Sequence, residues 1–270
     1  MADLNQLETE VQVLRDQLAQ LEQEYADLVV ELSEFETLYQ ARVGPWQAKL
    51  EEAQLHIAEY KLRIELLQWR GSALAPSQLE AEVEYRLRDQ RRYAHTIYEQ
   101  AEAAQRAVPH NPIDSAAQLD LKQIYRELAK RTHPDLAADD LDRMGREQQM
   151  KTINALYAQR DVDALRDLFR KLNIVEERRR ESPEERALRL SQEHDRLMAA
   201  IKRVKGDIAE LNHSAMMSLK LDYALGRARR RDVLSEVAAK VQTQLSEAEA
   251  QVNQLITRFR ELVEANGLAE

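Results

Sequence analysis

Residues 4–39 read LNQLETEVQVLRDQLAQLEQEYADLVVELSEFETLY, and this stretch decides the fold class. Its apolar side chains recur in alternating steps of three and four residues, which is the spacing of a coiled-coil seam. One isolated helix cannot bury such a seam, so the stretch requires a partner helix from the same chain or from a second copy. It therefore predicts a long helix within an all-α protein. The seam positions are Leu4, Leu7, Val11, Leu14, Leu18, Leu21, Tyr25, Leu28, Leu32, Phe35 and Tyr39.

A second apolar stripe runs from Val43 to Leu67, beside the pair Gly44-Pro45. Gly suits a left-handed helix C-cap and Pro discourages continuation, so we expect a hairpin that folds residues 46–70 back on residues 4–43. A kinked continuous helix is the alternative. Residues 1–70, the expected N-terminal coiled coil, carry 14 acidic and 6 basic side chains. This excess disfavours both nucleic acid and anionic lipid as partners of this segment.

The composition supports the same class. Of the 270 residues, 32% are charged and 5% are aromatic, values typical of long helices rather than of a large globular core. The absence of Cys excludes disulfides, Cys-zinc sites and thiol catalysis, and fits a reducing compartment. No apolar run approaches the ~20 residues of a transmembrane helix, and MADLNQLETE lacks the features of a secretory signal. We therefore expect an elongated, cytoplasmic protein without a transmembrane segment.

Capping signals predict where further helices begin. Ser77 with Glu80 predicts a capping box that opens a helical connector over residues 77–108. The sequence Ser-Pro-Glu-Glu at 182–185 predicts the start of a C-terminal coiled coil over residues 182–266. Both segments carry apolar stripes at helical spacing, so both belong to the all-α class.

The C-terminal coiled coil contains one break in its periodicity, near Gly226 and the basic cluster 227–231. An antiparallel hairpin and one unbroken rod both remain open for it. We interpret the Arg cluster as a solvated tip or as a partner of the acidic N-terminal segment. Residues 173–270 balance 17 basic against 17 acidic groups, which argues against a nucleic-acid or lipid surface.

The centre of the chain predicts a different unit. Residues 121–132 (LKQIYRELAKRT) form an amphipathic helical pattern that runs into His133-Pro134-Asp135. Pro134 lacks an N–H and disfavours helical geometry in the residue before it, so the helix should end near Thr132 or His133 and leave the triplet exposed. After an acidic loop, a second amphipathic run covers 147–159, and a further helix is suggested over 162–172.

This arrangement resembles the J-domain of DnaJ-type co-chaperones, in which helix II, an HPD loop and helix III form a small antiparallel hairpin. Tyr125, Leu128 and Ala129 correspond to the inner face of helix II, and residues 150–157 (MKTINALY) to helix III. The resemblance covers residues 114–172. The family's first helix is not visible in the sequence VPHNPIDS that precedes the module, so another segment must cover that face. We expect the helical connector, residues 77–108, to supply this cover.

The resemblance implies a non-enzymatic co-chaperone. Such a protein binds a DnaK-type ATPase chaperone, stimulates its ATP hydrolysis and recruits it to a client protein or assembly chosen by the coiled coils. Basic groups on the docking helix raise the association rate with an acidic surface, and their effect weakens with salt. The implied partner-binding residues are Lys122, Arg126, Lys130, Arg131, His133, Pro134, Asp135 and Lys151.

Two other functional classes are weighed against this one. The first is a coiled-coil structural or adaptor scaffold whose J-like module is degenerate and no longer stimulates an ATPase. The second is an enzyme, which we disfavour because the sequence has no phosphate-cradling Gly-rich loop and no nucleophile elbow. The six His residues show no metal-ligand spacing, so we expect no cofactor and no metal. We expect a homo-oligomer formed through the coiled coils.

Overall fold

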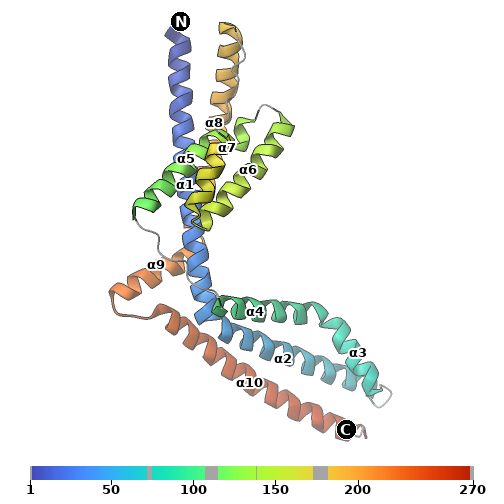
Figure 1. Ribbon diagram of the computed structural model, residues 1–270. Helices are drawn as coiled ribbons and strands as arrows, with labels where there is room; N and C mark the ends of the chain where they lie inside the picture. Colours follow the sequence, from blue (N-terminus) through green and yellow to red (C-terminus); the bar gives the residue numbers. More distant parts are fainter. Residues whose placement is uncertain (1, 72–74, 107–114, 138, 173–181, 268–270) are drawn as a thin grey trace. The chain divides into compact units, whose positions relative to one another are not determined.

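The computed structural model describes residues 2–71, 75–106, 115–137, 139–172 and 182–267 (Figure 1). Within these ranges every regular element is helical, so the all-α class is confirmed. None of the described helices is both long and apolar enough to cross a membrane. The chain divides into two compact units, residues 1–33 with 109–218 and residues 34–108 with 219–270. Each unit has its own core.

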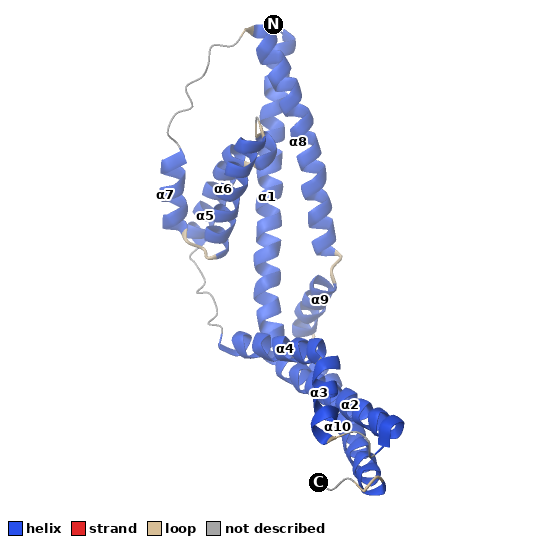
Figure 2. Ribbon diagram, turned by 90° about the vertical axis from the view of Figure 1, so that its right-hand side faces the viewer, coloured by secondary structure: helices blue, strands red, loops and turns tan. Residues whose placement is uncertain are grey.

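In the first unit, the N-terminal part of α1 (Ala2–Arg42) pairs with α8 (Pro183–Asn212), as both views show (Figures 1 and 2). The two helices are parallel, because Glu8 pairs with Arg186 and Arg15 Nε donates to Glu193 Oε1 at 2.6 Å. The heptad seam of α1 thus finds its partner helix in the same chain. Self-association is not needed to bury it. The buried seam residues are Val11, Leu18, Leu190, Leu197, Ala200, Ile201, Val204 and Ile208.

Three shorter helices complete the first unit: α5 (Ser115–Thr132), α6 (Asp140–Ala158) and α7 (Val162–Leu172). A 3-10 turn, η2 (Pro134–Leu136), follows α5. We call α5, η2, α6 and α7 together the central module. The run over 162–172 is a helix, as predicted, and α6 begins earlier than expected because the Asp139 carboxylate caps it, accepting from Asp142 N–H at 2.8 Å. The buried core residues of the module are Leu121, Tyr125, Leu128, Ala129, Met150, Ile153, Tyr157 and Leu165.

The helix that covers the central module is α1. Ala19 and Ala26 belong to the same buried cluster as the residues of α5, α6 and α7, and Val30 packs against it. The expectation that the helical connector covers this face is wrong, because its two helices pack on α2 in the second unit. The segment in which the first J-domain helix was sought, residues 108–115, falls outside the described residues except for Ser115, which begins α5.

In the second unit, α2 (Gly44–Arg70) packs against α10 (Val233–Ala265), and α3 (Pro76–Arg86) and α4 (Arg88–Arg106) return along α2. The α2–α10 pair is parallel, because Arg42 Nη2 lies 2.6 Å from Asp232 Oδ2 and the ring centroids of Tyr60 and Phe259 are 5.8 Å apart. The helical connector expected over residues 77–108 consists of two helices, α3 and α4, rather than one. The buried core residues here include Ala53, Leu66, Leu67, Leu79, Val83, Leu87, Leu245 and Ala248.

The hairpin expected at Gly44-Pro45 is not formed. Val43 has φ −105° and ψ −36°, and Gln47 N–H donates to Val43 O at 3.1 Å, so the backbone continues helically as in the kinked alternative. Pro45 fits the first turn of α2, where its missing N–H has no helical partner to lose. Gly44 instead permits close packing, since a Cβ added there would lie 3.1 Å from Ala101 Cβ of α4.

Two further expectations are corrected. The predicted capping box at Ser77 is not formed, because α3 begins at Pro76 after Ala75. Glu80 Oε2 instead accepts from Arg63 Nη2 of α2 at 2.8 Å. The segment 182–266 is neither a single hairpin nor a rod but three helices, with α9 (Ala215–Ala228) between α8 and α10. By contrast, the capping box at Ser182 is present as predicted, with Glu185 as its partner.

Candidate docking site

The loop after α5 is closely tied to the end of that helix. His133 N–H still donates to Ala129 O at 3.1 Å, and His133 then takes an extended conformation, φ −61° and ψ 129°, as the residue before a proline favours. The η2 turn brings Asp135 N–H within 3.1 Å of His133 Nδ1. The local sequence therefore places the His and Asp of the triplet side by side, and the predicted end of the helix near Thr132 is confirmed.

His133 is buried, with 3% of its surface exposed, so the expectation of an exposed triplet is wrong for this residue. Its Nε2 lies 2.9 Å from Oε1 of Glu22 on α1. Because Nδ1 accepts the Asp135 N–H, the ring's proton in the neutral form is on Nε2 and is donated to the Glu22 carboxylate. Both ring nitrogens are thus occupied within the chain.

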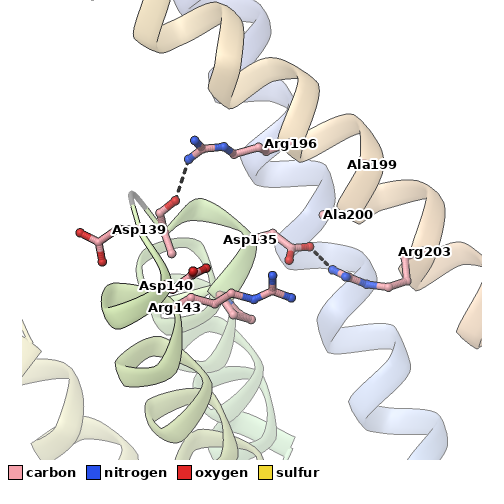
Figure 3. A pocket seen from close by; sticks show the side chains of 10 residues that line it. Asp135, Asp139, Asp140, Arg143, Arg196, Ala199, Ala200 and Arg203 are labelled. Carbon is pink, nitrogen blue, oxygen red and sulfur yellow. Dashed lines mark hydrogen bonds and ion pairs between the residues drawn. The ribbon is translucent and has the colours of Figure 1, made fainter.

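Asp135 is held from the other side, by α8. Its carboxylate pairs with the Arg203 guanidinium, and only 15% of the Asp135 side chain is exposed (Figure 3). Two helical turns before Arg203 on α8, Arg196 Nη1 donates to Ala137 O at 2.6 Å. Leu136 packs against the apolar seam between α1 and α8. The loop is therefore enclosed by the two long helices of its own unit.

A cavity of ≈ 530 Å³ remains between the loop and α8 (Figure 3). Its walls combine acidic residues of the loop and of α6 with basic residues of α8, and the small side chains Ala199 and Ala200 lie between those basic groups. The contact between the loop and α8 therefore combines two polar contacts with the apolar packing of Leu136, and it leaves this cavity unfilled.

The basic strip predicted on α5 faces acidic residues of α1. Lys122 Nζ lies 2.8 Å from Asp27 Oδ2, and Lys130 Nζ lies 2.6 Å from Asp16 Oδ1. Arg126, midway between the two lysines, is exposed and forms no salt bridge with another described residue. Two of the three predicted cations are therefore already neutralised within the chain.

Two of the predicted basic residues remain, Arg131 and Lys151. The Arg131 guanidinium lies over the ring of Phe169, 4.8 Å from its centroid. Lys151 is exposed on α6. The structure thus brings Lys122, Lys130, His133, Pro134 and Asp135 together, and we call these five residues the docking face.

Sequence reasoning missed the residues that contact the docking face. These residues are Asp16, Glu22 and Asp27 of α1 together with Arg196 and Arg203 of α8. The acidic character of residues 1–70 was the available signal, since it is complementary to the strip on α5. The spacing of residues within one helix does not say which other helix it will contact, so the sequence could not predict that α5 pairs with α1.

Asp27 is the most densely bonded of these groups. Besides Lys122, it accepts from Tyr157 Oη at 2.6 Å and from Gln23 Nε2 at 3.0 Å. Burial acts to raise the pKa of Asp27, but hydrogen bonds from Lys122, Tyr157 and Gln23 outweigh it and hold the pKa below its usual value. Burial, reinforced by the bond to Asp27, raises the pKa of Tyr157 far above its usual range. These shifts mark Asp27 as an ionised anchor between α1 and the central module.

No other constellation in the described part of the chain offers a competing chemical site. Groups of three or more His, Cys, Asp or Glu side chains that would hold a metal ion are not found among the described residues. The one buried carboxylate of the second unit, Glu59, accepts from Arg91 Nη2 at 2.6 Å and from Arg63 Nη1 at 3.4 Å, an arrangement that joins α2 to α4.

Comparison of the chain with protein-family models, with curated proteins and with solved structures gave no match. The functional argument therefore rests on the residues and their geometry.

Proposed function

We propose that this protein is a J-domain-type co-chaperone that docks on a DnaK-type ATPase chaperone through the docking face. Docking stimulates ATP hydrolysis by the chaperone and recruits it to a client protein selected by surfaces outside residues 114–172. The chain itself is not an enzyme and needs no cofactor. Its complete lack of Cys supports a place in the reducing cytoplasm.

One observation carries the proposal: the docking face already binds an acidic helical surface. Lys122, Lys130 and His133 contact Asp27, Asp16 and Glu22, three acidic side chains of α1. The resemblance assigns these same basic groups to contact with an acidic surface of the chaperone. Charge complementarity of this kind steers association and fixes the register of an interface. The proposal therefore follows from both the sequence motif and the chemistry that the motif performs within its own chain.

The second candidate is a structural scaffold whose J-like module has lost its partner. One specific observation favours it: both ring nitrogens of His133 and the Asp135 carboxylate have partners within the chain. In that case the triplet stabilises the junction between α5 and the long helices.

Single-turnover ATP hydrolysis by a DnaK-type chaperone separates the two candidates. We expect stimulation by the wild-type protein, its loss in His133→Gln, and weaker stimulation at higher salt because exposed charges are screened. His95→Gln is the matched control, since His95 is an exposed residue of α4. Absence of stimulation by the folded wild-type protein, even when the loop is freed from α1 and α8, would favour the scaffold. Equal stimulation by the two variants would contradict the role of His133 in docking.

A further inference from the structure

We propose that α1 and α8 form an internal gate over the docking face. In the closed state they occupy the surface that the chaperone would use, and docking requires the central module to move away from them. This inference concerns the regulation of the site and rests on the proposed function.

Contacts from two different helices close on the same loop. Glu22 of α1 contacts His133, Arg203 of α8 contacts Asp135, and Leu136 packs against the apolar cluster that the two helices form. With His133 3% exposed and the Asp135 side chain 15% exposed, a second protein has no access to the oriented groups of the triplet. Each gate helix therefore blocks a different functional side chain.

The acidic side chains of α1 that contact the docking face behave as internal competitors of the chaperone. Asp16, Glu22 and Asp27 lie along about three turns of one helix and meet Lys130, His133 and Lys122 in turn. A basic group that pairs with α1 cannot pair with a second acidic surface at the same time. The two interactions are mutually exclusive, so the apparent affinity for the chaperone is reduced by the fraction of molecules that are open.

The packing of the gate suits reversible opening. The apolar contribution of α1 to the core of the central module consists of small side chains, Ala19, Ala26 and Val30. The contact of α8 with the loop has one apolar side chain, Leu136, leaves a cavity of ≈ 530 Å³ and includes Arg203, whose side chain is 52% exposed. The α1–α8 seam, in contrast, is built from leucine, isoleucine and valine side chains. Separation of the module therefore exposes less apolar surface than separation of α1 from α8, and we expect the module to leave the helix pair intact.

Charge reversal on the two gate helices tests this. The variant Glu22→Lys/Arg203→Glu removes both contacts to the triplet, places a cation beside the His133 ring and places a second carboxylate beside Asp135. The control Glu24→Lys/Lys205→Glu makes the same charge changes on the same helices, at exposed positions that form no salt bridge with another described residue. The milder pair Glu22→Gln/Arg203→Gln serves if the reversal lowers the helical content measured by circular dichroism.

The first readout needs no chaperone. Diethyl pyrocarbonate modifies accessible neutral imidazoles, and peptide mass spectrometry compares His133 with the exposed His56 and His95 of the second unit. We expect His133 of the wild type to react at least about tenfold more slowly than these references, since labelling must await local opening. The charge-reversed protein should lose most of this protection, and the control should keep it. Wild-type His133 labelling as fast as His56 and His95 would overturn the gate.

The second readout is single-turnover ATP hydrolysis with subsaturating co-chaperone. The charge-reversed protein should stimulate at least about tenfold more than the wild type, because it loses two contacts from the closed state and one charge-assisted hydrogen bond alone accounts for about that factor. His133→Gln in the same background should abolish the gain. Equal stimulation by the wild type and the charge-reversed protein would refute the gate. If His133 becomes accessible yet no form stimulates, the proposed function fails, and only the burial of the loop stands.

Discussion

Tyr157→Phe is the sharpest test of how the central module is held to α1. The substitution removes only the hydroxyl that donates to Asp27 Oδ1 at 2.6 Å. The aromatic ring stays in place against Tyr125, with ring centroids 4.5 Å apart. Any loss of stability therefore reports the hydrogen bond rather than a change in packing.

The magnitude follows from the partners. A hydrogen bond to a charged group contributes about 1.5–3 kcal/mol, whereas one between neutral groups contributes about 1 kcal/mol. Asp27 keeps its bonds to Lys122 and Gln23 and is partly exposed, which places the cost of Tyr157→Phe near the lower end, at about 1.5–2 kcal/mol. Tyr125→Phe loses a bond to the neutral amide of Asn154, 2.9 Å away, and should cost about 1 kcal/mol.

Hydrogen exchange measured by mass spectrometry resolves the effect by segment. Peptides from α5 and α6 should exchange about 10–30 times faster in Tyr157→Phe and about 5 times faster in Tyr125→Phe, while α10 peptides serve as the internal reference. Tyr93→Phe is the control, because the Tyr93 side chain is exposed. The reasoning is refuted if Tyr157→Phe behaves like Tyr93→Phe, or if Tyr125→Phe has the larger effect.

Three further predictions concern the seam and the titrating groups. Leu197→Ala removes a fully buried seam residue of α8, so it should cost about 2–5 kcal/mol and raise exchange in α1 and α8, whereas Leu188→Ala at an exposed position should not. The pKa of Asp27 and that of Glu80 lie below their usual values of 3.8 and 4.5, so the stability they supply is present above those values and is lost as the pH falls through the folded pKa. Acid titration followed by circular dichroism should show this loss, and Asp27→Asn should flatten the response of the first unit measured by hydrogen exchange. Tyr125 and Tyr157 have raised pKa values, so their contribution to the free energy of unfolding is complete below about pH 10 and is lost at higher pH. The fall in stability with rising pH should therefore become less steep when both are replaced by Phe. An unchanged dependence on pH would contradict the burial of their hydroxyls.

The helices were predictable where the local signals were strong. The seam of α1, the capping box at Ser182 and the helix over 162–172 needed only spacing and cap chemistry, which act within a few residues. Gly44-Pro45 was misread because the same two residues serve a helix end and a helix start. The neighbour that decides between these roles is Ala101 of α4, more than fifty residues away in the sequence.

The candidate site was predictable in its residues but not in its surroundings. His133, Asp135 and the lysines of α5 were identified from the motif, and the structure brings them together. Their burial was not predicted, because it depends on Glu22 and Arg203, which lie on two helices far from the triplet in the sequence. The local sequence of a loop does not show whether a helix from elsewhere in the chain covers it.

By itself, the sequence determined the all-α class, the apolar stripes of the long helices and a few helix ends, such as the end of α5 and the start of α8. Apolar spacing and capping groups act between residues a few positions apart, so they can be recognised in the sequence alone. Only the tertiary structure decided that α1 pairs in parallel with α8, that α2 pairs with α10, and that Asp16, Glu22 and Asp27 meet the docking face. The physical reason is that a heptad specifies an apolar seam without naming its partner, and an exposed charge binds whichever opposite charge the packed helices bring within reach.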